Sequence, residues 1–74
     1  MEIKDIKKFD FTQPEIDYIL QQARFNDIQE RVFNRLTHKM GKQSIVQISI
    51  EENISTATVS RIIAQIKDKI LRVL

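Results

Sequence analysis

Apolar side chains recur every three or four residues along most of the chain, the spacing that places them on one face of an α-helix. The periodic segments are 13–24, 27–40, 44–52 and 56–73. Residues 1–11 lack this pattern, and we expect an extended or disordered arm there. The pattern predicts an all-α protein, a compact four-helix domain that occupies the single domain 1–74. The apolar positions expected in its core are Ile16, Ile19, Leu20, Ala23, Ile28, Val32, Phe33, Leu36, Met40, Val59, Ile62, Ile63, Ile66, Ile70 and Val73.

Residues that cap helices stand at each predicted start. A Ser, Thr or Asn oxygen can accept the unpaired backbone N–H groups of the first turn, and a Glu or Gln three residues later can reach back. The candidate caps are Thr12 with Glu15, Asn26 with Gln29, Ser44 with Gln47, and Ser55. Pro14 fits a first helical turn, where its missing N–H costs little. Gly41 is a predicted helix stop, because glycine takes the left-handed conformation readily.

Composition narrows the functional classes. The 74 residues suffice for one small domain, whose limited core argues against a deep catalytic pocket. The absence of cysteine excludes a disulfide, a thiolate zinc site and a cysteine nucleophile, and His38 has no second histidine as a metal-binding partner. We therefore expect no enzyme, no metal and no cofactor. The longest apolar run, Ile62-Ile63-Ala64, is far shorter than the roughly 18 residues of a membrane span, so we expect a cytoplasmic protein without membrane association.

The formal net charge of +2 is unevenly distributed. The first 24 residues carry four basic and five acidic side chains, whereas the remaining 50 carry eight basic and five acidic ones. The positive excess thus lies with the last three predicted helices, which is where a nucleic-acid contact should be sought.

Segment 44–66 carries the most specific pattern. A short helix is followed by a three-residue turn and a longer helix, which is a helix-turn-helix arrangement. Small Ser49 stands where the two helices would cross closely, Asn53 can adopt the left-handed turn conformation, and Ile54 fills the corner. In DNA-binding proteins with this arrangement, the second helix enters the major groove.

The side of helix 56–66 opposite its apolar face carries small residues around one arginine. Small side chains let a helix sink deep into the major groove, where Arg61 could reach the O6 and N7 atoms of a guanine. Gln65 lies on the flank of this face. Asp68 would repel phosphates, but it lies about 18 Å beyond the start of the helix.

The strings Gly41-Lys42-Gln43-Ser44-Ile45-Val46-Gln47-Ile48-Ser49, Asn53-Ile54-Ser55 and Thr58-Val59-Ser60-Arg61 resemble the helix-turn-helix of sigma factor region 4 and of LuxR-type regulators. In those families a preceding helix, here 27–40, completes the unit, so the resemblance covers about residues 26–72. The chain also resembles small standalone sigma-region-4-like proteins of Gram-positive bacteria and their prophages. The resemblance implies base contacts from Thr56, Ala57, Ser60 and Arg61, and phosphate contacts from Ser44, Ser55 and Thr58. We add Gln65 to the base-contacting set and Lys42 to the phosphate-contacting set.

Two positions depart from the family pattern. The families usually carry an apolar residue where Glu52 stands and a polar one where Ile50 stands. On helix 44–52, Glu52 falls on the core side, whereas Val46 and Ile50 point away from it. Either the helix ends before Glu52, or Val46 and Ile50 form a second apolar strip that helix 13–24 covers.

Two other stretches each allow two interpretations. Arg31, Arg35, His38 and Lys39 adjoin the apolar face of the second helix. They either touch phosphates or form the snorkelling edge of an amphipathic helix. Beyond Ile66, the last helix has more apolar surface than DNA reading needs. This surface either packs back on helix 13–24 or forms the seam of a homodimer that pairs two recognition helices.

Three functions follow as hypotheses. The first is a transcription regulator that binds a double-stranded DNA operator sequence-specifically as a homodimer, with helix 56–66 in the major groove. The second is a sigma-like factor that contacts RNA polymerase as well as promoter DNA. The third is a helical protein-interaction or dimerisation module that does not bind DNA.

Overall fold

The computed structural model describes residues 9, 11–37 and 43–73, and these form four helices. The helices are α1 (Gln13–Gln22), α2 (Asp27–Thr37), α3 (Ile45–Glu52) and α4 (Thr56–Val73). No strand occurs in the described ranges. The prediction of an all-α four-helix domain is confirmed. The predicted end of the second helix, with Met40 and the stop at Gly41, lies outside the described residues.

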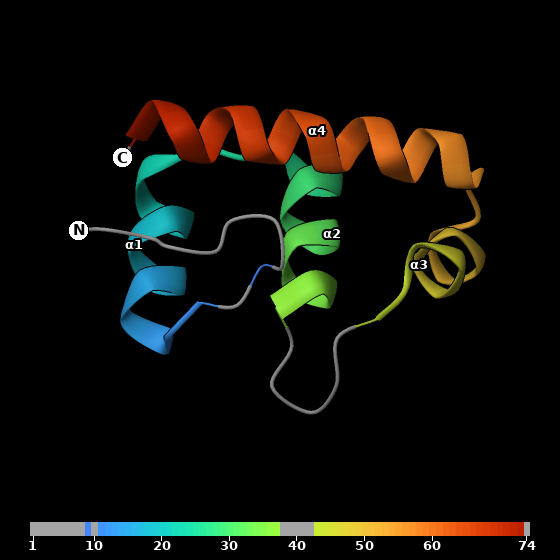
Figure 1. Cartoon of the computed structure of the whole chain (residues 1–74), viewed down its shortest axis with the longest axis horizontal. Helices are drawn as coiled ribbons and strands as arrows, with labels where there is room; N and C mark the ends of the chain where they lie inside the picture. The colour runs from blue at the N-terminus through green and yellow to red at the C-terminus, as the bar shows by residue number, and fades with distance from the viewer. Residues whose placement is uncertain (1–8, 10, 38–42, 74) are drawn as a thin grey trace.

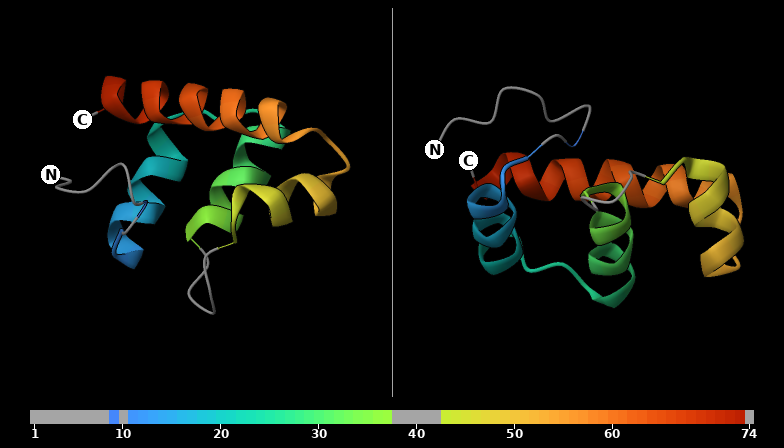
Figure 2. Two further views of the ribbon diagram at one scale, coloured as in Figure 1. Left: turned by 45° about the vertical axis from the view of Figure 1, so that its right-hand side comes forward. Right: turned by 90° about the horizontal axis from the view of Figure 1, so that it is seen from below.

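Helix α4 organises the fold. In Figure 1 it lies along one side of the molecule, with α1 and α2 beneath it and α3 crossing beneath its N-terminal end. The two further views in Figure 2 show the same arrangement, and each of the three shorter helices packs against α4. The side of α4 that faces away from these helices is consequently an outer surface of the domain.

Capping boxes fix the starts of α1 and α2, as the sequence predicts. Thr12 Oγ1 accepts the backbone N–H of Glu15 at 3.4 Å, and Glu15 Oε1 accepts the backbone N–H of Thr12 at 2.7 Å. Asn26 and Gln29 exchange the equivalent bonds at 2.9 and 3.1 Å. These reciprocal bonds satisfy N–H groups that the first turn of a helix leaves unpaired.

Left-handed residues follow two of the helices. Arg24 has a φ of 54°, and α1 ends at Gln22 rather than at the predicted residue 24. The Arg24 carbonyl oxygen accepts a hydrogen bond from Lys69 Nζ at 3.2 Å, which ties the α1–α2 connection to α4. Asn53 after α3 has φ 57° and ψ 46°, the left-handed conformation that the sequence predicts for the turn.

The predicted apolar faces meet in one core. The largest fully buried side chains are Phe33, Ile19, Ile48, Ile66, Ile70, Val32 and Val59. Ile16, Ala23, Ile62 and Ile63 are also buried, and Leu20, Ile28, Leu36 and Val73 pack at the edge. All predicted core positions within the described residues are therefore confirmed.

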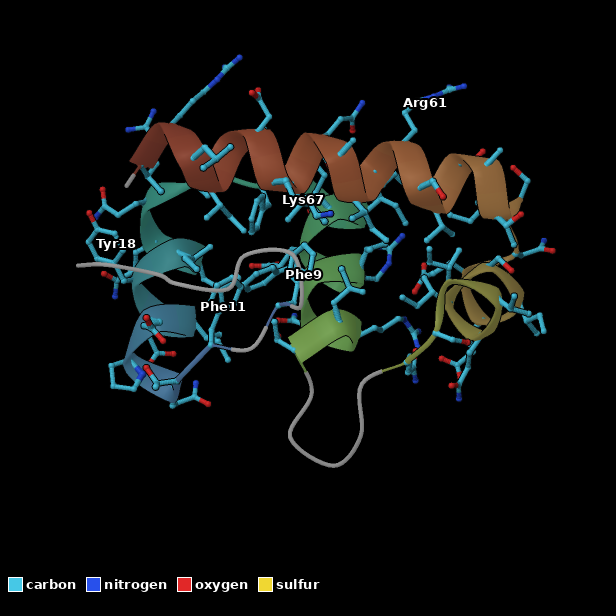
Figure 3. All side chains as sticks on the ribbon, in the orientation of Figure 1. Phe9, Phe11, Tyr18, Arg61 and Lys67 are labelled. Atoms are coloured by element: carbon cyan, nitrogen blue, oxygen red, sulfur yellow. The ribbon has the colours of Figure 1, made fainter. Side chains whose placement is uncertain are left out.

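Two phenylalanines correct the prediction of an extended or disordered arm over residues 1–11. Phe9 is only 4% exposed, and its ring packs edge-on against Phe11 and Phe33, with centroid distances of 5.9 and 6.3 Å. Lys67 Nζ lies 5.8 Å from the centroid of the Phe9 ring (Figure 3). Phe9 and Phe11 thus belong to the core, and the other residues of the predicted arm lie outside the described ranges. Phe11 directly precedes the first helix cap, the position at which a hydrophobic residue often packs against the helix as a hydrophobic staple. This position could have predicted from the sequence that Phe11 packs on the domain.

The C-terminal half of α4 packs on α1. Ile70 is fully buried, and Val73 packs at the edge of the core. The Tyr18 hydroxyl donates a hydrogen bond to the Val73 carbonyl oxygen at 3.3 Å. Of the two interpretations of this apolar stretch, packing within the domain is the one observed. Leu71 remains exposed, and Leu74 lies outside the described residues.

Candidate nucleic-acid interface

A three-residue turn joins α3 to α4 and creates a helix-turn-helix arrangement. The Asn53 backbone N–H donates to the Ile50 carbonyl oxygen at 3.3 Å, and the Ile54 N–H donates to the Ser49 carbonyl oxygen at 3.0 Å. Ser49 is buried, and its hydroxyl donates to a carbonyl oxygen of its own helix at 2.6 Å. A small residue whose hydroxyl is satisfied locally lets α3 and α4 approach closely, as the sequence predicts.

Four predicted base-contacting residues lie on the exposed side of α4, and we call them the outer face of α4. They are Thr56, Ala57, Ser60 and Arg61. The Arg61 side chain points away from the body of the domain (Figure 3). Within the described part of the chain, no ion pair involves Arg61. Its guanidinium, which carries five N–H donors, therefore lies on the outer surface among short neighbouring side chains (Figure 3).

The predicted phosphate-contacting hydroxyls cap α3 and α4. Ser44 Oγ accepts the backbone N–H of Gln47 at 3.2 Å. Ser55 Oγ accepts the backbone N–H of Thr58 at 3.1 Å and lies 2.9 Å from Thr58 Oγ1. A hydroxyl that accepts a bond still carries its own hydrogen, so Ser44 can donate to a phosphate at the same time. Lys42, the fourth predicted phosphate contact, lies outside the described residues.

Gln65, the fifth predicted base-contacting residue, is exposed but hydrogen-bonded within the domain. Its Oε1 atom accepts a hydrogen bond from Gln29 Nε2 at 3.1 Å. Gln29 in turn is almost completely buried at the start of α2. Gln65 therefore differs from the outer face of α4, because its side-chain oxygen is engaged by another helix.

Arg31 and Arg35 of α2 form an ion-pair cluster with the last turn of α3. Arg31 Nε lies 3.1 Å from Glu52 Oε1, and Arg35 Nε lies 2.9 Å from Glu52 Oε2. Arg35 Nη1 also donates to Glu51 and, at 3.2 Å, to Gln43 Oε1. Arg35 thus binds residues just before and at the end of α3. We call Arg31, Arg35, Glu51 and Glu52 the α2–α3 clamp.

The clamp gives the two described residues of the predicted basic stripe acidic partners that neither interpretation named. Acids of α3 pair with both Arg31 and Arg35, and the choice between a phosphate contact and a snorkelling edge stays a prediction. His38 and Lys39 of the same predicted stripe lie outside the described residues. The sequence did carry a signal for these ion pairs: an acid falls on the core side of α3, and two arginines lie beside the apolar face of α2.

Glu52 is held as a carboxylate in this cluster. Its side chain is 8% exposed. Burial by itself would raise its pKa, but the hydrogen bonds and positive charges of Arg31 and Arg35 outweigh that effect, and the pKa of Glu52 lies below its ordinary value. This pairing explains how an acid occupies the core side of α3.

Of the two explanations offered for Glu52 from the sequence, an early end of the helix is wrong, whereas the second apolar strip is present but lacks the predicted cover. Helix α3 continues to Glu52, and its outward apolar residues are not covered by α1, which packs against α4. Val46 is 59% exposed and Ile50 is 73% exposed. Together with Ile45, which is 41% exposed, they form what we call the apolar strip of α3.

Asp68 lies further along α4 and is neutralised locally. It forms an ion pair with Arg72 at 2.9 Å, and both side chains are exposed. The acid that we expected to repel phosphates therefore has a positive partner one helical turn away.

Across the part of the chain that the structure describes, no helix combines the length and apolar character needed to cross a membrane. Comparison with family models, curated proteins and solved structures found no match to the chain. A functional assignment consequently depends on the geometry set out above.

Proposed function

We propose that this protein binds double-stranded DNA sequence-specifically and regulates transcription, with the N-terminal half of α4 in the major groove. The observation that carries the proposal is the outer face of α4, where small side chains surround one exposed arginine. The opposite side of the same helix holds the other three helices. An α-helix fits the major groove, and short side chains let its backbone approach the base edges.

The predicted contacts of the outer face of α4 and of the helix caps have different roles in this arrangement. Arg61 reads a guanine through two hydrogen bonds, to O6 and N7. The short residues of the outer face of α4 determine how deeply the helix enters the groove. Ser44, Ser55 and the unpaired backbone N–H groups at the start of α4 lie at the phosphates and hold the register. The α2–α3 clamp keeps its arginines neutralised, so it adds little to phosphate binding.

Selection of bound sequences from a random pool of duplexes at about 50 mM salt tests the proposal. We expect one enriched motif that contains a guanine. We also expect the affinity for that motif to fall as salt rises, because neutralised phosphates release their counterions. Failure to shift any duplex at low salt would refute the proposal.

Substitution of Arg61 tests the assigned base contact. Arg61→Ala should cost about 1–3 kcal/mol of binding free energy and relax the preference at one base pair. Arg72→Ala combined with Asp68→Asn, compared with Asp68→Asn alone, is the matched control, because it removes the same charge near the other end of α4 without leaving Asp68 unpaired. An equal loss of affinity on all duplexes would make Arg61 a phosphate contact instead.

The apolar strip of α3 favours a second candidate function, in which the protein binds another protein. An exposed apolar patch on a small domain marks an interaction site. The partner in this version is RNA polymerase, as for a sigma-like factor that also contacts promoter DNA, or another helical protein without any DNA. Co-purification with core polymerase that is lost in Ile50→Ser would support it. If the protein binds DNA but retains no polymerase, the transcription-regulator proposal stands and the sigma-like one is rejected.

Homodimerisation is a separate part of the regulator proposal. Two copies of α4 would meet two half-sites about one duplex turn apart. Sedimentation at high protein concentration, with and without the selected duplex, measures the state directly. A monomer without DNA and a single copy per duplex would remove the homodimer from the proposal.

A further inference from the structure

A chain of hydrogen bonds runs from the start of α2 to Gln65 on α4. Gln29, only 4% exposed, lies at its centre. Gln29 Oε1 accepts hydrogen bonds from Lys69 Nζ at 2.6 Å and from the Asn26 backbone N–H at 3.1 Å. Gln29 Nε2 donates to Gln65 Oε1 at 3.1 Å. This series of hydrogen bonds therefore links the cap of α2 to an exposed side chain of α4.

The two donors that bond Gln29 determine the orientation of the side-chain amides of both Gln29 and Gln65. A lysine ammonium and a backbone N–H can only donate, so the part of Gln29 that faces Lys69 and Asn26 must be its carbonyl oxygen. The remaining part of that amide is the nitrogen, which also can only donate. Gln65 must meet this nitrogen with its oxygen, and its own NH₂ group is turned away from Gln29.

We propose that Gln29 sets Gln65 as a donor-only residue of the DNA-reading surface, and that Gln65 selects a guanine. This inference rests on the proposed function. A glutamine with both amide groups available reads adenine, by donating to N7 and accepting from the N6 amino group. With its oxygen turned toward Gln29, Gln65 presents its NH₂ group, and not its oxygen, to the DNA. Guanine and thymine both present acceptors and no donor in the major groove, but guanine carries two acceptors, N7 and O6, whereas thymine carries only O4. The two hydrogens of the Gln65 NH₂ group therefore fit guanine best.

The neighbouring residue reinforces this chemistry. Arg61 stands four residues before Gln65, which places the two side chains beside each other along the helix. Arginine also has donors and no acceptor. The two residues together should favour adjacent base pairs with guanine acceptors, and the amino groups of adenine and cytosine should be disfavoured.

The variant Gln29→Glu should reverse the orientation of Gln65 with almost no change of shape. Glutamate is as well suited as glutamine to this capping position. The introduced carboxylate keeps the bonds from Lys69 and Asn26 but cannot donate, so the Gln65 NH₂ should turn inward and its oxygen outward. Gln29→Met is the control, because it removes the hydrogen-bond partner of Gln65 without favouring the reversed orientation of the Gln65 amide.

Selection from random duplexes then compares the three proteins. For the wild type we expect guanine at the position that Gln65 reads. For Gln29→Glu the adenine-to-guanine ratio there should rise about three- to tenfold, while the guanine read by Arg61 stays. Gln29→Met should show a relaxed preference. An unchanged preference at every position in Gln29→Glu, or a uniform loss on all sequences, would overturn the role of Gln65 in base selection.

Hydrogen exchange of the Gln65 side-chain NH₂, followed by NMR without DNA, tests the orientation separately. Exchange should be fast in the wild type and slower in Gln29→Glu, and the same spectra show whether the variant is folded. Equal exchange in both proteins would overturn the inference, whether or not DNA is bound. If exchange slows as expected but the wild type binds no duplex, the proposed function fails and the base-reading role fails with it, whereas the orientation stands.

Discussion

Replacing Glu52 with glutamine tests whether the α2–α3 clamp holds α3 in place. The change keeps the shape of the side chain but removes the charge that pairs with Arg31 at 3.1 Å and Arg35 at 2.9 Å. The Glu52 side chain is 8% exposed and that of Arg35 is 29% exposed, so their bond is sheltered from water, whereas Arg31 is 56% exposed. A sheltered hydrogen bond to a charged group contributes about 1.5–3 kcal/mol, and an exposed ion pair about 0–1 kcal/mol. Because the amide can still accept one bond, we expect Glu52→Gln to lower the free energy of unfolding by about 2 kcal/mol.

Thermal and urea denaturation followed by circular dichroism measure this loss. For a domain of this size, 2 kcal/mol corresponds to a fall in Tm of about 8–16 °C. Asp68→Asn is the matched control, because it removes the same charge from an exposed pair with Arg72 and should cost less than about 0.5 kcal/mol. If Glu52→Gln destabilises the protein no more than Asp68→Asn does, the clamp does not hold α3.

The pH dependence of the same difference follows from the lowered pKa of Glu52. A carboxyl whose pKa is lower in the folded than in the unfolded protein stabilises the fold at pH values above its unfolded pKa. That contribution disappears as the pH falls through the folded value. The difference in unfolding free energy between wild type and Glu52→Gln should therefore be constant near neutral pH and shrink below pH 4.5, the ordinary value for this group. A difference that stays constant down to acid unfolding would contradict the assigned pairing.

Substitutions at two further positions test a correction to the sequence prediction, at Phe9, and a confirmed part of it, at Asn53. Phe9→Ala should cost about 3–5 kcal/mol in chemical denaturation, because it empties a buried site between aromatic rings, whereas a residue of an unpacked arm would cost almost nothing. Asn53→Ala should cost about 1 kcal/mol, because alanine resists the observed φ of 57°, and Asn53→Gly should be close to neutral. Equal stability of the two Asn53 variants would contradict a left-handed turn.

The sequence by itself determined the helices, most of their boundaries and the outer face of α4. These features depend on interactions within about four residues: the spacing of apolar side chains, the capping pair Thr12 with Glu15, and the left-handed preference of Asn53. Such patterns can be recognised from neighbouring residues alone, although the packing of the helices against one another supplies most of their stability. The exposed position of Arg61 followed as well, because a helix with one apolar face must turn the opposite face to solvent.

Only the tertiary structure decided how polar groups from different helices pair. Glu52 looked misplaced in its own helix, and its partners Arg31 and Arg35 lie 21 and 17 residues away. Gln65 looked like an ordinary surface residue until Gln29, 36 residues distant, engaged its oxygen. The rings of Phe9 and Phe11 likewise joined the core by meeting Phe33. Periodicity shows which side of each helix is buried, but the angle at which the helices cross determines which groups on those sides come within hydrogen-bond distance.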